Sequence, residues 1–153
     1  MTLHRLTRAL FVVLMAATLV ACDTADSEDS DPVTPDPTPT TGDITGRIAL
    51  SAGAAGSVSN TRIAIYQSFD DWNADRFIRQ VAASGDGTFA FDDITPGVYY
   101  FDAFKDNNNN GAIDSGDFFG VLGTNSFQSF RPTPTEVRAG VNTNFDFQIL
   151  IIP

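Results

Sequence analysis

Apolar and polar residues alternate along several short stretches of the chain after residue 43. Ile44, Gly46, Ile48 and Leu50 are separated by polar or small residues and would share one side of an extended strand. The same alternation recurs in three later stretches, at Ile63 and Ile65, at Phe89 and Phe91, and at Phe145, Phe147 and Ile149. This pattern predicts β-strands that each bury one face.

Turn-forming residues separate these stretches, as at Asp86-Gly87 and at Pro96-Gly97. No segment keeps a helical period for long, although residues 68–77 contain one helical turn that Ser68 can cap. Short strands between Gly, Pro, Asn and Asp turns are typical of β-sandwiches. We therefore predict a single all-β domain over residues 44–153.

The turns and strands of residues 85–117 also follow a recognisable order, a G-x-[FY]-x-F strand that leads into a P-G-x-Y turn. The matching residues are Gly87, Phe89, Phe91, Pro96, Gly97 and Tyr99. This order resembles that of the carboxypeptidase-regulatory-like, or prealbumin-like, modules of bacterial surface proteins. The resemblance implies a seven-stranded prealbumin-like or immunoglobulin-like β-sandwich with a binding or structural role and no catalysis.

Residues 106–117, DNNNNGAIDSGD, carry oxygen-bearing groups at the spacing of a twelve-residue calcium loop. The six ligand positions, from the first to the twelfth, fall on Asp106, Asn108, Asn110, Ala112, Asp114 and Asp117. Carboxylates, amide oxygens and the main-chain oxygen of Ala112 are the hard ligands that Ca²⁺ prefers, and Gly111 allows the sharp turn. The loop therefore predicts a calcium site, with Ile113 expected to anchor it in the core.

The segments that flank this loop read as strands, so we do not expect the helix pair of an EF-hand. Calcium loops of dockerin modules and of β-sandwich adhesin repeats are similar to it. Position twelve is Asp117 where glutamate is usual, and its shorter side chain limits bidentate binding. The alternative is an Asn-Gly hairpin turn with solvated acids beside it.

The N-terminus has the features of a secretion signal. Arg5 and Arg8 precede an apolar run over residues 9–20, which is shorter than the roughly 20 residues of a membrane-spanning helix. The sequence LVAC at residues 19–22 resembles the bacterial lipobox, in which the cysteine is acylated with palmitate-type chains. We expect a lipoprotein signal peptide over residues 1–21 and a lipid anchor on Cys22, the only cysteine.

Residues 22–43 are rich in acids and prolines and contain no Lys or Arg, which predicts a disordered linker. A chain anchored in this way belongs to the cell envelope, on the outer membrane or the cell surface. The leaflet stays open, because acids after a lipidated cysteine resemble one surface-export signal whereas Asp23 resembles an inner-membrane retention signal.

Charge and composition exclude several functions. The formal net charge of −10 argues against nucleic-acid binding, which needs a basic surface. The only histidine, His4, lies in the signal peptide, so serine-histidine and cysteine-histidine catalysis and ordinary zinc sites are not expected. The adjacent acids at 70–71 and 92–93 fit a helix start and a turn. We therefore expect no enzyme activity.

Two functions remain. The first is a calcium-braced structural or protein-interaction module of a membrane-anchored lipoprotein, with an unknown envelope protein or glycan as partner. The second is a carbohydrate- or small-ligand-binding surface lipoprotein, in which Trp72, Phe118 and Phe119 form an aromatic platform. A calcium-independent spacer is a third reading.

Overall fold

The structure, a computed structural model, describes residues 36–153. The predicted signal peptide, Cys22 and the first part of the linker lie outside the described residues. The elements follow in the order β1 (Gly42–Leu50), β2 (Arg62–Tyr66), α1 (Phe69–Asn73), β3 (Arg79–Ala82), β4 (Thr88–Ile94), β5 (Gly97–Lys105), β6 (Phe118–Val121), the 3-10 turn η1 (Phe127–Ser129), β7 (Thr135–Val137) and β8 (Asn142–Ile151).

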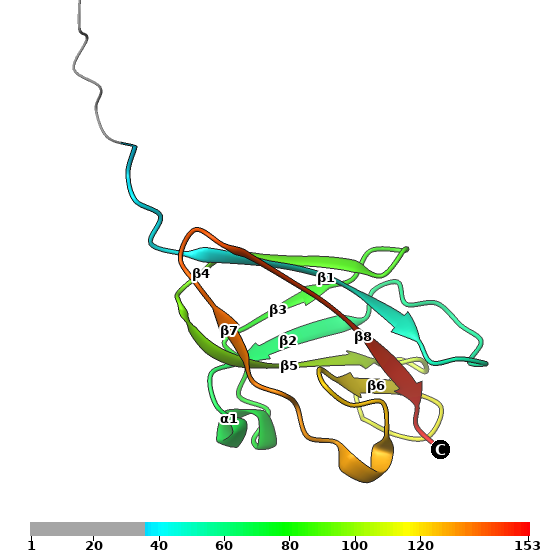
Figure 1. The fold of residues 1–153 in the computed structure, drawn as a ribbon. Coiled ribbons are helices and arrows are strands. Elements are labelled where there is room, and N and C mark those ends of the chain that lie inside the picture. The colour runs from blue at the N-terminus through cyan, green and yellow to red at the C-terminus, as the bar shows by residue number, and fades with distance from the viewer. Residues whose placement is uncertain (1–35) are drawn as a thin grey trace, which may run out of the picture. The chain divides into compact units, whose positions relative to one another are not determined.

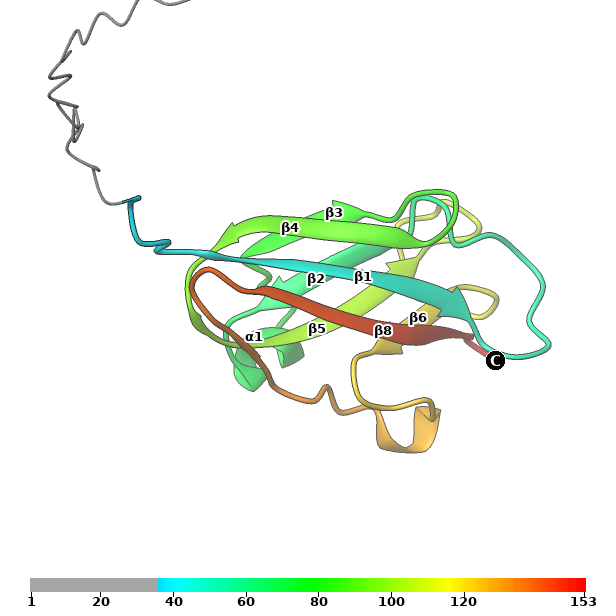
Figure 2. The same cartoon turned by 45° about the horizontal axis from the view of Figure 1, so that its top comes forward.

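The strands are hydrogen-bonded in the order β3-β2-β5-β6-β8-β1-β4, and β7 pairs with the start of β5. Strands β4, β1 and β8 form one side of the domain and β3, β2, β5 and β6 the other (Figures 1 and 2). The two ends of the order, β3 and β4, come into contact without pairing as strands, so that the sheet is nearly closed.

Strand β8 joins the two sides. Its residues 142–149 run parallel to β1, from the pair Asp43–Asn142 to the pair Leu50–Ile149. Its residues 150 and 151 pair antiparallel with β6, through Phe118–Ile151 and Phe119–Leu150. The first and last strands, β1 and β8, therefore lie side by side, and because they run parallel, the start of β1 and the C-terminus lie at opposite ends of this pair (Figure 1).

The core lies between the two sides and is rich in phenylalanine. The ring of Phe101 on β5 lies 4.8 Å from that of Phe145 and 6.3 Å from that of Phe91, measured between centroids. Ile44 and Ile48 of β1 and most of the other alternating residues are also buried. The period-two pattern thus identified the inward face of the strands correctly.

Local signals also account for two connections. Ser68 caps α1 by accepting a hydrogen bond from the main-chain nitrogen of Asp71 at 3.0 Å, as the sequence predicted. Gly87 has a φ of +87°, which glycine adopts readily, in the tight turn after β3. That turn does not close a hairpin, because β4 pairs with β1 and not with β3.

The all-β prediction is confirmed, but the architecture differs from the predicted seven-stranded sandwich. The sheet has eight strands, because residues 135–137 form the short additional strand β7, which buries only Val137 and has no alternating pattern. The two sides are also hydrogen-bonded to each other through β8 instead of forming separate sheets. Neither helical segment within residues 36–153 has the length and apolar character to cross a membrane.

Replacing Phe101 by alanine should lower the free energy of unfolding by about 3–5 kcal/mol, because the ring packs between both sides of the core. Val98 of the same strand is 50% exposed, and its replacement by alanine should cost less than about 0.5 kcal/mol. Urea unfolding of the two variants measures the difference. Equal losses would show that the core does not depend on this ring.

Candidate functional site

The loop of residues 106–117 connects β5 to β6 at the end of the sheet where the chain terminates (Figure 1). Its last residues are tied to the backbone beyond β8. Gly116 donates to the main-chain oxygen of Ile152 at 2.9 Å, and Ile152 donates to that of Asp117 at 2.7 Å. The conformation of the loop is therefore coupled to the position of the C-terminal strand.

The first half of the loop curls around its own side-chain oxygens. Asp106 accepts hydrogen bonds from the main-chain nitrogens of Asn110 at 3.2 Å and Gly111 at 2.7 Å. Asn108 accepts from the nitrogen of Asn110 at 3.0 Å, and Asn110 accepts from that of Ala112 at 2.8 Å. Gly111 has a φ of +80°, a conformation that favours glycine at this turn.

Asp114 faces the two asparagines at the third and fifth positions. Its carboxylate accepts hydrogen bonds from the side-chain nitrogens of Asn108 at 3.0 Å and Asn110 at 2.5 Å. The asparagine side chains are therefore held within the loop rather than free in solvent.

Asp117 at the twelfth position anchors the loop. Its side chain is fully buried, and its carboxylate accepts hydrogen bonds from the main-chain nitrogens of Asn107 at 2.8 Å and Asp114 at 3.2 Å. Ile113 is 59% exposed, so the prediction that it anchors the loop in the core was wrong. The buried acid fixes the base of the loop and leaves the apolar side chain outside.

The donor set of this loop fits Ca²⁺ in its chemistry, with three carboxylates, two amide oxygens and the carbonyl of Ala112. Within residues 36–153, however, no three His, Cys, Asp or Glu side chains gather closely enough to hold a metal ion. Asp114 is bonded to the amide nitrogens of the asparagines instead. Binding a cation requires these nitrogen contacts to give way to contacts between oxygen and metal.

The three residues of the predicted aromatic platform occupy different environments. Phe118 is 2% exposed and belongs to the core. Its neighbour Phe119 points to the opposite face of β6, where its ring lies 5.4 Å from that of Phe130. Trp72 on α1 packs against Phe69 at 5.4 Å. The structure therefore does not bring all three to one surface.

A buried carboxylate, Asp102 on β5, was not identified from the sequence. It is 4% exposed and accepts hydrogen bonds from the hydroxyl of Tyr66 at 3.0 Å and the indole nitrogen of Trp72 at 3.1 Å. Burial raises the pKa of Asp102 to about 7, although the hydrogen bond from Tyr66 and the charge of Arg62 act in the opposite direction. An acid within the apolar run VYYFDAFK was the signal for this site.

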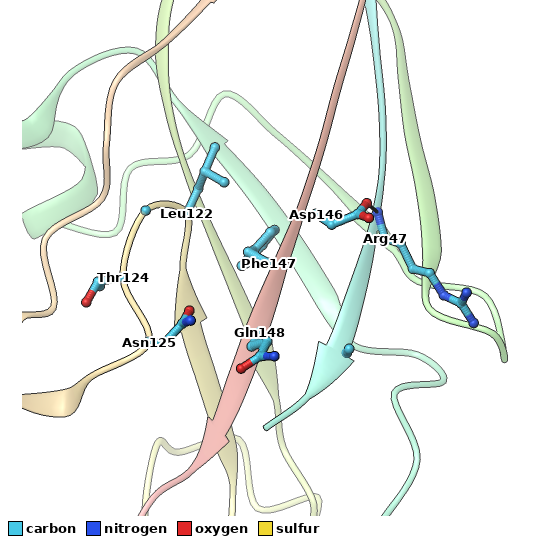
Figure 3. A pocket seen from close by; sticks show the side chains of 9 residues that line it. Arg47, Leu122, Thr124, Asn125, Asp146, Phe147 and Gln148 are labelled. Carbon is cyan, nitrogen blue, oxygen red and sulfur yellow. Dashed lines mark hydrogen bonds between the residues drawn. The ribbon is translucent and has the colours of Figure 1, made fainter. Parts of the chain in front are cut away.

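A groove of about 510 Å³ lies between β8 and the segment that follows β6, beside residues 146–148, which pair with β1 but not with β6. Figure 3 shows its side chains, which come from β1, from β8 and from the segment that follows β6. Leu122 and Phe147 supply the apolar part of its lining. A guanidinium, a hydroxyl, two amides and a carboxylate line the remainder; they belong to Arg47, Thr124, Asn125, Gln148 and Asp146.

Hydrogen bonds hold the wall of the groove that Arg47 and Asp146 form. Asp146 accepts a hydrogen bond from the main-chain nitrogen of Arg47 at 2.8 Å, and the guanidinium Nε of Arg47 donates to the main-chain oxygen of Asp86 at 2.7 Å. Its volume lies within the range of small-ligand pockets, and its lining combines an apolar part with a few charged and amide groups.

Replacing Asp117 by alanine should destabilise the domain by about 1–3 kcal/mol even in the presence of a chelator, because two main-chain donors lose their acceptor. Asn107→Ala is the matched control, since it keeps the main-chain nitrogen that Asp117 accepts from and removes only an exposed side chain. Urea unfolding with chelator compares them. An unchanged midpoint for Asp117→Ala would mean that this acid does not hold the loop.

Comparisons with known proteins identify no family for this chain. No family model matches it, and neither does any curated protein sequence. Among solved structures, it is similar to a protein of Pseudomonas aeruginosa that is described as a candidate carbohydrate-binding protein. The two share 14% sequence identity with a TM-score of 0.44, over 73% of this chain and 90% of the other. A likeness of this size assigns neither a family nor a ligand.

Proposed function

We propose that the domain is a non-catalytic module of a cell-envelope lipoprotein, and that Ca²⁺ bound by residues 106–117 braces it. The observation that supports this proposal is the inward curl of the loop. The side chains at its first, third and fifth positions all accept main-chain hydrogen bonds from residues further along the same loop. A loop closed in this way holds hard oxygen atoms near one another before a cation arrives.

Calcium would have two effects here: it would reduce the repulsion between carboxylates and it would order a loop that is hydrogen-bonded to the C-terminal strand. Asp106, Asp114 and Asp117 place three carboxylates in one short loop, and a divalent cation offsets their mutual repulsion. Because residues 116 and 117 are hydrogen-bonded to Ile152, an ordered loop also holds the C-terminal strand against β6. The metal thus has a structural role and takes part in no reaction.

The envelope setting rests on the N-terminal sequence. Acylation of Cys22 would anchor the protein in the outer membrane or at the cell surface, and the acidic linker would hold the domain away from the lipid. Calcium is abundant outside cells, so a dissociation constant of about 10⁻⁴–10⁻³ M is sufficient to fill such a site. The partner of the braced module is then an envelope protein or a glycan.

The groove beside β8 supports a second candidate function, the binding of a carbohydrate or another small polar ligand. Asn125 and Gln148 offer amides, and Asp146 offers a carboxylate, around the apolar surface of Phe147 and Leu122. A sugar ring has hydroxyls at its edge and an apolar face, so its chemistry matches both parts of this lining. This groove, and not Trp72, Phe118 and Phe119, is the surface that we propose for such a ligand.

Calcium at about one hundred times its dissociation constant should stabilise the domain by about 2.7 kcal/mol and raise its melting temperature by several degrees. Asp106→Ala should abolish the rise. Asp92→Ala removes the same charge from an exposed position outside the loop and should keep it. Differential scanning calorimetry with calcium, with magnesium and with chelator measures these shifts.

The calcium proposal fails if the melting temperature of the unaltered domain is the same with calcium and with chelator. It also fails if Asp106→Ala and Asp92→Ala lose the shift equally, because the effect would then be one of general charge screening.

Binding of an oligosaccharide in the groove should move the amide resonances of residues 122–125 and 146–148 in nuclear magnetic resonance spectra. Asn125→Ala and Gln148→Ala should each weaken binding about fivefold, the value of one hydrogen bond of about 1 kcal/mol. Gln80→Ala on β3 is the control, since Gln80 lies outside the groove. Shifts centred on Trp72 instead would assign the ligand to α1.

A further inference from the structure

Helix α1 covers the outer face of β2 and β5, and Asp102 lies beneath it. The ring of Phe69 lies 5.4 Å from that of Trp72 and 6.2 Å from that of Tyr100 on β5. The guanidinium of Arg131 lies 4.6 Å above the ring of Phe69. The helix is only five residues long, so these side-chain contacts, and not its own hydrogen bonds, hold it on the sheet.

Only one of the two carboxylate oxygens of Asp102 accepts hydrogen bonds in the part of the chain that the structure describes. Its Oδ2 accepts from the hydroxyl of Tyr66 and from the indole nitrogen of Trp72. Its Oδ1 is buried and has no hydrogen-bond partner within residues 36–153, and the same holds for the nearby Nε of Arg62. A buried anionic oxygen without a donor is costly, whereas the neutral acid places less charge there.

The phenol of Tyr66 adds a second constraint. Its oxygen lies 3.0 Å from Oδ2 of Asp102 and 2.9 Å from Oδ1 of Asp75, but it carries a single proton. When both acids are ionised, one of the two carboxylates receives no proton from Tyr66. When Asp102 is protonated, its Oδ2 can donate to Tyr66 while Tyr66 donates to Asp75, so that one hydrogen-bonded chain joins the three side chains and the unpartnered Oδ1 carries less charge.

Other charged groups around Asp102 do not replace that proton. The charge of Arg62 on β2 lowers the pKa of Asp102, but no hydrogen bond joins these two side chains, and Nη2 of Arg62 lies 3.9 Å from Asp75. Asp71 of α1 is paired with Arg76 at 2.9 Å, and Arg131 covers Phe69.

From these contacts we propose that Asp102, Tyr66 and Trp72 form a protonation-dependent latch that keeps α1 docked on β5. Protonated Asp102 holds the helix in place. Ionised Asp102 favours the state in which α1 lifts and water reaches the carboxylate. The latch would make the surface formed by α1 and its neighbouring turns sensitive to the pH outside the cell.

The direction of the pH dependence follows from linkage. Burial raises the pKa of Asp102 to about 7, so protonation favours the docked state. The stabilisation is complete below the unfolded pKa of about 3.9 and is lost as the pH rises through about 7. Burial also raises the pKa of Tyr66, with Asp102 as the next cause, so that its phenol keeps its proton throughout.

Fluorescence tests the latch in the whole chain, because Trp72 is the only tryptophan and its indole contacts Asp102 directly. The emission of the unaltered protein should titrate with a midpoint near 7. Asp102→Asn, which cannot ionise, should give a flat profile over the same range. Asp92→Asn on β4 removes an exposed carboxylate from the other side of the domain and should leave the titration as it is.

Two further measurements make the outcome decisive. The unfolding equilibrium constant of the unaltered protein should rise by up to tenfold per pH unit between about pH 5 and about pH 6, and this slope should disappear in Asp102→Asn. The carboxyl-carbon resonance of Asp102 gives its pKa without any substitution. A pKa for Asp102 below about 4.5, or a Trp72 titration that survives in Asp102→Asn, would overturn the proposal.

Discussion

Strand β8 is hydrogen-bonded to both sides of the domain, and the rest of the structure depends on this double pairing. Along residues 142–149 it runs parallel to β1, and at its end it pairs with β6. On its other edge β8 pairs with β6 only at residues 150 and 151, although its pairing with β1 runs without interruption to residue 149. The groove lies beside residues 146–148 of β8, between this strand and the segment that follows β6, and the loop of residues 106–117 lies at the end where β6 and β8 pair.

This arrangement explains why the loop matters for more than its own conformation. Only two residue pairs join β6 to β8, so this junction has few hydrogen bonds of its own. The bonds between Ile152 and residues 116 and 117 extend the junction into the loop, and the buried side chain of Asp117 holds the loop from within. A cation that orders the loop would therefore strengthen the contact between the two sides of the sheet.

Local sequence signals predicted the strands, the cap at Ser68 and a sharp turn at Gly111, because each depends on residues close in the chain. The strand β7, the pairing of β8 with both β1 and β6, and the groove depend on contacts between distant segments, which alternation does not encode. Asp102 was missed for a related reason. Helix α1 buries Asp102 on the outer face of β5. The alternating aromatic residues of this strand indicated burial of its inner face only.

Hydrogen exchange of individual main-chain amides tests the central claim, that calcium in the loop stabilises the junction between β6 and β8. With calcium, the amides of Asp117 and Ile152 and those at the end of β8 should exchange more slowly than with chelator. The amides of β2 and β3 should slow much less, because they lie away from the junction. Equal slowing everywhere, or no change at Ile152, would contradict the account.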